Sequence, residues 1–210
     1  MLDEATICDL LRPFDLGLSS SQVGTILAYL DLLMRWNTKI NLTSIRSPEQ
    51  AVTRHFGESL FLAKRLQLTG TLLDVGSGAG FPGLALHIAF PDLPTTLLEP
   101  VAKKRAFLKE VARTCGFASV DVRPERLGEF ARLNPNPVFN TLTARAVGDH
   151  RSLVLEGAKV LKPGGRVCLW VGHEQGELLG GYTNQVHWEE PAKIPMGQER
   201  EIWIGNYRPM

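Results

Sequence analysis

The spacing of hydrophobic positions changes about one third of the way along the chain. In the first part apolar residues recur every three or four positions from Val23 onward, which is the period of an amphipathic helix. A serine cap begins this run at Ser19, and Pro48 begins a second helical run. We therefore predict a helical extension over residues 1–67, with a polar, basic connector at residues 35–46 between its helices.

The rest of the chain alternates short apolar runs with amphipathic stretches. We predict strands near 71–75, 95–99, 119–123, 138–143 and 165–171, and helices near 82–90, 103–115, 126–132 and 149–161. Gly164 and Gly165 are expected to turn before the fifth strand, and segments 186–188 and 201–204 to close the sheet as an antiparallel pair. This alternation predicts an α/β fold, a Rossmann-like, doubly wound and mostly parallel sheet over residues 68–210.

The segment L-L-D-V-G-S-G-A-G-F-P-G, residues 72–83, carries the clearest chemical signal. A buried strand, a glycine turn and a helix in this order form the nucleotide-binding corner of such a sheet. Phe81 stands where the dinucleotide fingerprint needs its third glycine, and Asp74 precedes the turn by two residues. Both features favour S-adenosylmethionine (SAM) over a nicotinamide cofactor or a merely structural turn. We expect cofactor contacts from Asp74, Gly76, Ser77 and Gly78.

Polar residues also follow the next three predicted strands, where ligands of parallel sheets bind. Glu99 lies about 20 residues after the turn, the usual place for a carboxylate that accepts the ribose hydroxyls. Pro124 and Glu125 follow the third strand and are predicted to meet the adenine. Arg145 lies just beyond the fourth predicted strand and is our candidate catalytic residue, directed either at a cofactor carboxylate or at a purine edge. No [DN]-P-P-[FYW] motif follows this strand, which argues against an exocyclic amine as methyl acceptor.

Charge adds a local signal. The formal net charge is only +1, yet residues 102–151 hold ten Lys/Arg against five Asp/Glu. Such a surplus either meets nucleic-acid phosphates or belongs to solvated helix faces.

The three cysteines are far apart and form no C-x-x-C pair, and the five histidines show no metal-ligand spacing. We therefore expect no metal. The chain also lacks a signal-peptide pattern and any apolar run of the roughly 18 residues that a membrane helix needs. We expect a cytoplasmic protein without a membrane partner.

Four motifs together resemble a known family. L-D-L-L-M-R-W-N-T-K-I-N-L-T-S-I-R, then R-H-F-G-E-S-L, the glycine turn and T-A-R-A follow one another as in the RsmG (GidB) small-subunit rRNA methyltransferases. The resemblance covers about residues 20–172. It implies transfer of the SAM methyl group to N7 of one guanine in 16S rRNA, with the free rRNA or the small ribosomal subunit as partner.

The resemblance also implies site residues. The family's SAM-contacting positions map onto Gly76, Phe81, Pro124, Glu125 and Arg145. Two positions depart from the family's common pattern, because Val171 replaces a lysine and Pro124 an alanine. The first departure concerns the wall on the side of the base, and neither concerns the glycine turn.

RNA is expected to lie on basic and polar residues of the connector, of the helix after it, and of the helix after the second strand. These residues are Arg35, Lys39, Asn41, Arg46, Arg54, His55, Lys103, Lys104 and Arg105. Two alternatives stay open: a methyltransferase of small molecules, and a non-catalytic RNA- or protein-binding module with the same fold.

Overall fold

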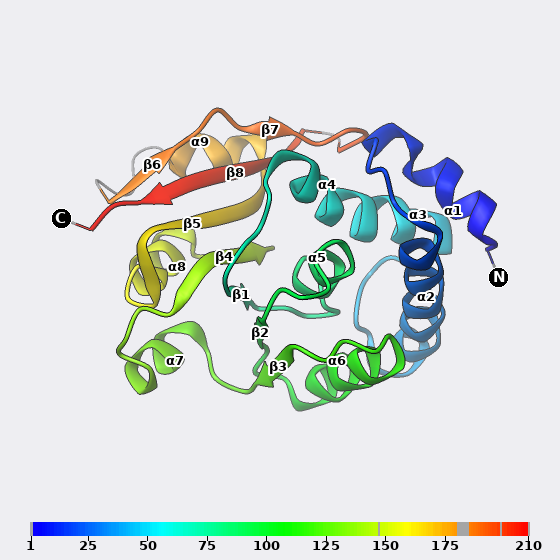
Figure 1. Ribbon diagram of the computed structural model, residues 1–210, viewed down its shortest axis with the longest axis horizontal. Coiled ribbons are helices and arrows are strands. Elements are labelled where there is room, and N and C mark those ends of the chain that lie inside the picture. Colours follow the sequence, from blue (N-terminus) through cyan, green and yellow to red (C-terminus); the bar gives the residue numbers. More distant parts are fainter. Residues whose placement is uncertain (1, 147, 180–184, 198, 210) are drawn as a thin grey trace.

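The computed structural model describes residues 2–146, 148–179, 185–197 and 199–209 (Figure 1). Its N-terminal part is helical, as predicted. The elements are α1 (Glu4–Leu11), the short 3-10 helix η1 (Arg12–Phe14), α2 (Ser20–Ile40), α3 (Pro48–Ala51), the π-helical turn η2 (Val52–Gly57) and α4 (Glu58–Arg65).

Local chemistry sets both ends of α2, the longest helix of this part. Ser19 caps its N-terminus in a capping box with Gln22, since each side chain bonds the other residue's backbone N–H. Asn41 ends it in the left-handed region at φ 50°, a conformation that asparagine tolerates better than most residues. Residues 35–40 of the predicted connector therefore belong to α2, and the connector in the structure begins at Asn41.

The remainder forms one sheet with flanking helices. Its strands are β1 (Leu72–Val75), β2 (Thr95–Leu98), β3 (Val120–Arg123), β4 (Phe139–Arg145), β5 (Leu161–Gly172), β6 (Val186–Trp188), β7 (Ala192–Lys193) and β8 (Arg200–Tyr207). Its helices are α5 (Gly83–Ala89), α6 (Ala102–Thr114), α7 (Leu127–Leu133), α8 (His150–Gly157) and α9 (His173–Leu179). The strand order is β3-β2-β1-β4-β5-β8-β6, and β7 pairs with β8.

This topology locates the binding edge of the sheet. Strands β1 to β5 are parallel, and β8 runs antiparallel to β5 and β6. The chain leaves β1 toward β2 on one side and returns to β4 on the other, so the topological switch point lies between β1 and β4. Ligands of such sheets bind beyond the carboxyl ends at this point. The predicted doubly wound, mostly parallel sheet is confirmed.

Helices flank the sheet on both faces (Figure 1). Alternating strand residues are buried against these two layers. Leu72 and Leu97 pack in one cluster with α1, α2, α4, α5 and α6, whereas Leu73 and Leu98 pack in another with α7 and α8. The helical extension therefore shares a core with one face of the sheet. The division at residue 67 stays a prediction.

Further details of the predicted elements differ from the structure. Helix α8 ends at Gly157 and not at 161, because Val160 and Leu161 are buried at the start of β5. The expected glycine turn is a bulge inside β5, since Leu161 pairs with Phe139 and Arg166 with Thr141. The closing antiparallel pair exists, but β6 pairs with residues 205–207 of β8. Helix α9 was not predicted.

Candidate functional site

The glycine turn after β1 is held by backbone hydrogen bonds to the end of β2. Gly76 and Ser77 both donate their N–H to Leu98 O, at 2.9 and 3.1 Å. Gly76, Gly78 and Gly80 all have positive φ values, a region that is strained for residues with a Cβ. A Cβ at Gly78 would meet only Gly76 O at 3.8 Å, whereas one at Gly80 would lie 2.1 Å from the Tyr29 hydroxyl. The turn thus faces open space at Gly78 and packs against the helical extension at Gly80.

Asp74 lies beneath this turn and is fully buried. Its Oδ1 accepts a 2.8 Å hydrogen bond from the Thr143 hydroxyl, while its buried Oδ2 has no partner within the described residues. Burial raises the pKa of its carboxyl to about 6. The carboxylate therefore supports the turn from below, and the expected contact between Asp74 and the cofactor stays a prediction.

Glu99 lies at the carboxyl end of β2 and is 3% exposed. Its two oxygens accept backbone N–H groups, one from Gly78 at 2.9 Å and one from Val101 at 2.8 Å. Each carboxylate oxygen has room for a further donor, so the residue joins the turn to β2 and keeps acceptor capacity.

A cavity of about 600 Å³ opens beside the turn, at the ends of β1 to β3. Val75, Gly76 and Leu98 line it from the strands, and Leu127 and Leu153 line it from α7 and α8. Acidic groups line it as well: Glu125, Glu129, Asp149 and Glu156. Arg123 holds Glu125 at 2.9 Å and lowers the pKa of its carboxyl. We call this space the first cavity.

Phe81 does not line the first cavity. Its side chain is 5% exposed and lies within a group of rings, stacked on Tyr29 at 5.3 Å and on His55 at 4.7 Å between ring centroids. A phenylalanine here joins the turn to the helical extension, which is a packing role that a third fingerprint glycine would not supply. The family resemblance implies that Phe81 contacts SAM, but its ring lies against Tyr29 and His55 and not in the first cavity. That contact stays a prediction.

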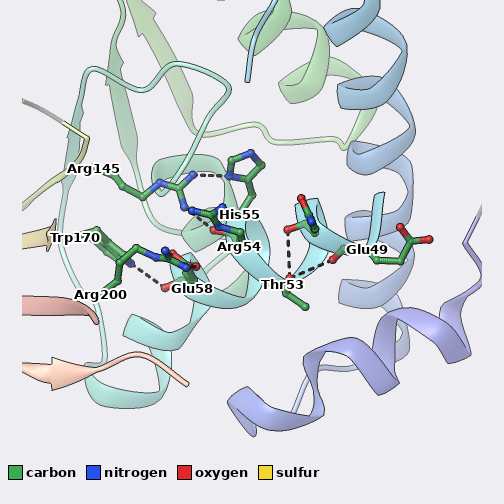
Figure 2. A network of polar contacts seen from close by, with 9 residues as sticks. Glu49, Thr53, Arg54, His55, Glu58, Arg145, Trp170 and Arg200 are labelled. Carbon is green, nitrogen blue, oxygen red and sulfur yellow. Dashed lines mark hydrogen bonds and ion pairs between the residues drawn. The ribbon is translucent and has the colours of Figure 1, made fainter. Parts of the chain in front are cut away.

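Arg145 extends from the end of β4 toward η2, on the other side of the switch point (Figure 2). Its Nη2 donates to His55 Nδ1 at 2.6 Å, and its Nη1 donates to Arg54 O at 2.8 Å. The Arg145 Cζ lies 5.6 Å from the centroid of the Phe81 ring. Hydrogen bonds and the aromatic face thus fix the guanidinium from three directions.

A second cavity of about 300 Å³ lies next to Arg145. Three arginines line it, namely Arg54, Arg145 and Arg200, together with Trp170 and the connector residues 43–45. The single acid of its lining is Glu58, which is buried and bonded to Arg200 Nη2 at 2.6 Å. The Trp170 indole N–H donates to Glu58 O at 2.8 Å, so α4, β5 and β8 meet at this point (Figure 2).

The predicted RNA-binding residues separate into two groups. Several basic side chains have structural partners: Arg35 pairs with Asp31 at 2.9 Å, Arg46 donates to Asn37 O, and Arg105 donates to Pro100 O. In the described part of the chain no hydrogen bond or ion pair occupies the basic groups of Lys39, Arg54, Lys103 and Lys104.

Two polar members of the predicted set also have internal partners. Asn41 accepts from Arg46 Nη2 at 3.0 Å. The His55 side chain is buried at 7% exposure and both of its ring nitrogens are hydrogen-bonded within the protein, so its expected RNA contact stays a prediction. Its neighbour Arg54 is exposed.

Sequence reasoning missed Thr43, Glu58, Trp170 and Arg200. They come from four separate segments, and their spacing along the chain matches no motif. R-H-F-G-E-S-L held the one local signal, since Glu58 is an acid within an apolar helical run. Of the two departures from the family pattern, Val171 is buried in the lining of the second cavity, whereas Pro124 is exposed after β3.

Two further findings concern the described residues as a set. None of their helices combines the length and the apolar character needed to cross a membrane. They also contain no group of three or more His, Cys, Asp or Glu side chains placed to hold a metal ion.

Comparison with known proteins agrees with this geometry. A family model described as GidB, rRNA small subunit methyltransferase G, matches residues 22–200. A protein of Chloroflexus aggregans named ribosomal RNA small subunit methyltransferase G is 35% identical over 213 residues, covering 96% of this chain and 88% of its own. The protein of that name from Stenotrophomonas maltophilia is 38% identical, covering 89% and 88%.

Solved structures show the fold alone. A ribosomal protein L11 methylase from Lactobacillus delbrueckii subsp. bulgaricus superposes with a TM-score of 0.62 at 13% identity, covering 74% of this chain and 79% of that one. The match extends the methyltransferase likeness to the arrangement of the sheet and its helices.

Proposed function

The chain belongs to the GidB family of small-subunit rRNA methyltransferases, and from this premise we propose that it methylates N7 of one guanine in 16S rRNA. It is a methyltransferase that uses SAM as its methyl donor. The guanine, the N7 position and the residues in contact with each ligand are the parts that we propose.

The first cavity suits SAM in shape and charge. Its leucines offer an apolar slot to the adenine, and the backbone of Gly76 lines it. The neighbouring Gly78 faces open space, which leaves room for a ligand beside the turn. SAM carries a sulfonium and an ammonium group, which the acidic lining complements. We assign Glu99 to the ribose hydroxyls, Glu125 to the adenine and the turn at Gly76–Gly78 to the methionine part.

The second cavity is our candidate for the guanine. The observation that carries the proposal is that its described lining has three guanidinium groups and no free proton acceptor. His55 uses both ring nitrogens, and Glu58 is paired with Arg200. Guanine N7 has a lone pair and no proton, so it attacks the sulfonium methyl without a general base.

Catalysis then rests on positioning. N7, the methyl carbon and the sulfur must lie in line, with water excluded from the reacting atoms. Ala144 of β4 pairs with Val75 of β1, which lines the first cavity, and Arg145 follows Ala144 and lines the second. A guanidinium there suits O6 of a guanine whose N7 must stay free.

Methyl transfer from labelled SAM to small-subunit rRNA tests the proposal. N7-methylguanosine is labile to mild reduction and aniline cleavage, so we expect one cleavage site in 16S rRNA that coincides with the label. Gly78→Arg is the matched control, because its side chain enters the open space beside the turn and should abolish both SAM binding and the label. Label on an exocyclic amine, on a ribose or only on small molecules would overturn the assignment.

A further inference from the structure

His55 connects the helical extension to Arg145 at the second cavity. It lies in the π-helical turn η2, and its buried ring is stacked on Phe81. Single π turns inside helices are frequently found at functional sites. The ring is bonded on both edges, to Arg145 on one side and to the connector on the other.

The hydrogen-bond donors determine the proton position on this ring. A guanidinium only donates, so His55 Nδ1 must be the unprotonated acceptor of Arg145 Nη2 at 2.6 Å. The ring proton is then on Nε2 and is donated to the Thr43 hydroxyl oxygen at 2.9 Å. Burial, followed by the charges of Arg145 and Arg54, lowers the pKa of His55 to about 3, which keeps the ring neutral.

The connector in turn fixes Thr43. The Thr43 backbone N–H donates to Asn37 Oδ1 at 2.9 Å, and the buried Asn37 amide donates to Ile45 O at 3.0 Å. The Thr43 hydroxyl also accepts from Ile45 N at 3.2 Å. A continuous set of hydrogen bonds therefore runs from the end of α2 through Thr43 and His55 to Arg145.

We propose that His55 is a positioning residue, which holds the Arg145 guanidinium at the second cavity in the orientation used for methyl transfer. The inference rests on the proposed function, in which Arg145 meets the acceptor base. The proposal gives the W-N-T-K-I-N-L-T segment a structural role. Through Thr43 and His55, the conformation of the connector determines the orientation of the Arg145 side chain.

Two substitutions of His55 separate this role from simple packing. His55→Leu fills similar space without an acceptor, and we expect the single-turnover methyl-transfer rate at saturating SAM and RNA to fall by about tenfold or more. His55→Asn keeps an oxygen at the bonded distance of Nδ1 and should recover most of that loss. The dissociation constant of SAM should change by less than about twofold, because Arg145 lines the second cavity and not the first.

A double-mutant cycle with Arg145→Ala is the decisive measurement. If His55 acts through Arg145, adding His55→Leu to Arg145→Ala lowers the rate less than about twofold further. Thr43→Val provides the same test from the other end of the ring should His55→Leu fail to fold. Thr53→Val is the matched control, because its hydroxyl lies in the same turn and bonds helical carbonyls of Glu49 and Gln50 (Figure 2).

Additive losses in the cycle, or no recovery with His55→Asn, would overturn the proposal and leave His55 as a packing residue. The cycle needs only a measured methyl transfer and not a particular acceptor atom. A label mapped away from guanine N7 would therefore refute the proposed function while this test still gave its own answer.

Discussion

At the scale of single residues, Asp74 shows how a motif position acquires its chemistry from burial. The sequence places an acid before the glycine turn, and the fold removes it wholly from water under that turn. Only one of its oxygens is hydrogen-bonded to a side chain, the hydroxyl of Thr143. Its ionised form is therefore poorly solvated, which is why the pKa of its carboxyl is raised to about 6.

The raised pKa of Asp74 predicts that the free energy of unfolding decreases as the pH rises. Since the folded pKa lies above the ordinary value of 3.8, the stability contribution is fully present below that value and is lost as the pH rises through about 6. We expect the wild-type chain to lose about 2 kcal/mol relative to Asp74→Asn between pH 4 and pH 7. Urea unfolding of both proteins across this range measures the difference. A difference that does not vary with pH would show that the ionised carboxylate is well solvated.

At the scale of elements, the contact of α4 with β8 connects the N-terminal helical extension to the last strand of the sheet. Glu58 is the first residue of α4 and Arg200 the first of β8, and they form three hydrogen-bonded contacts. Glu58 is 4% exposed, so its charge depends on this partner. The helical extension is thereby attached to the antiparallel edge of the sheet and to the second cavity (Figure 2).

Removing one partner should therefore be costly. We expect Arg200→Ala to lower the free energy of unfolding by about 3 kcal/mol, because it leaves the buried carboxylate of Glu58 without its hydrogen-bonded partner. Denaturant unfolding gives the value. The control is Arg113→Ala, which breaks an exposed pair with Glu110 on one helix and should have no measurable effect. Equal effects of the two variants would contradict the importance of this junction.

At the scale of the whole molecule, the basic surface near the contact of α2 with α6 is our candidate RNA face. Trp36 and Phe107 pack at 5.6 Å between ring centroids, and Lys39 and Lys103 each lie about one helical turn from this contact. Both lysines are exposed. Arg46 and Arg105 bond backbone carbonyls instead, so replacing them would also disturb the connector and the end of β2.

The double variant Lys39→Ala/Lys103→Ala is thus the cleanest test of RNA docking. If both lysines neutralise phosphates, the slope of log affinity against log salt should become less steep by about 1.4, at roughly 0.7 per contact with a single strand. Titrations of 16S rRNA at several salt concentrations measure it, and SAM affinity should stay unchanged. Lys159→Ala, an exposed lysine of the α8 side, is the control. An unchanged slope in the double variant would move the RNA face elsewhere.

The sequence by itself determined the elements and the cofactor. Apolar periodicity, the serine at the start of α2, and glycine in the turn are local signals, since each depends on residues within a few positions. They were sufficient for the parallel sheet, the glycine turn and the family resemblance. Boundaries failed where local and tertiary preferences differ, as at Val160 and Leu161, whose apolar pattern extends a helix but whose burial belongs to β5.

Only the tertiary structure decided what the polar residues do. Three features depend on how the connector and distant segments of the chain pack together. They are whether Arg46 meets solvent or a carbonyl, whether His55 is exposed or buried, and whether Glu58 has a cationic partner. The energies of such groups are set by desolvation and by a few hydrogen bonds, and neither can be read from neighbouring positions. The second cavity and the hydrogen bonds that direct Arg145 therefore became visible only once the chain was folded.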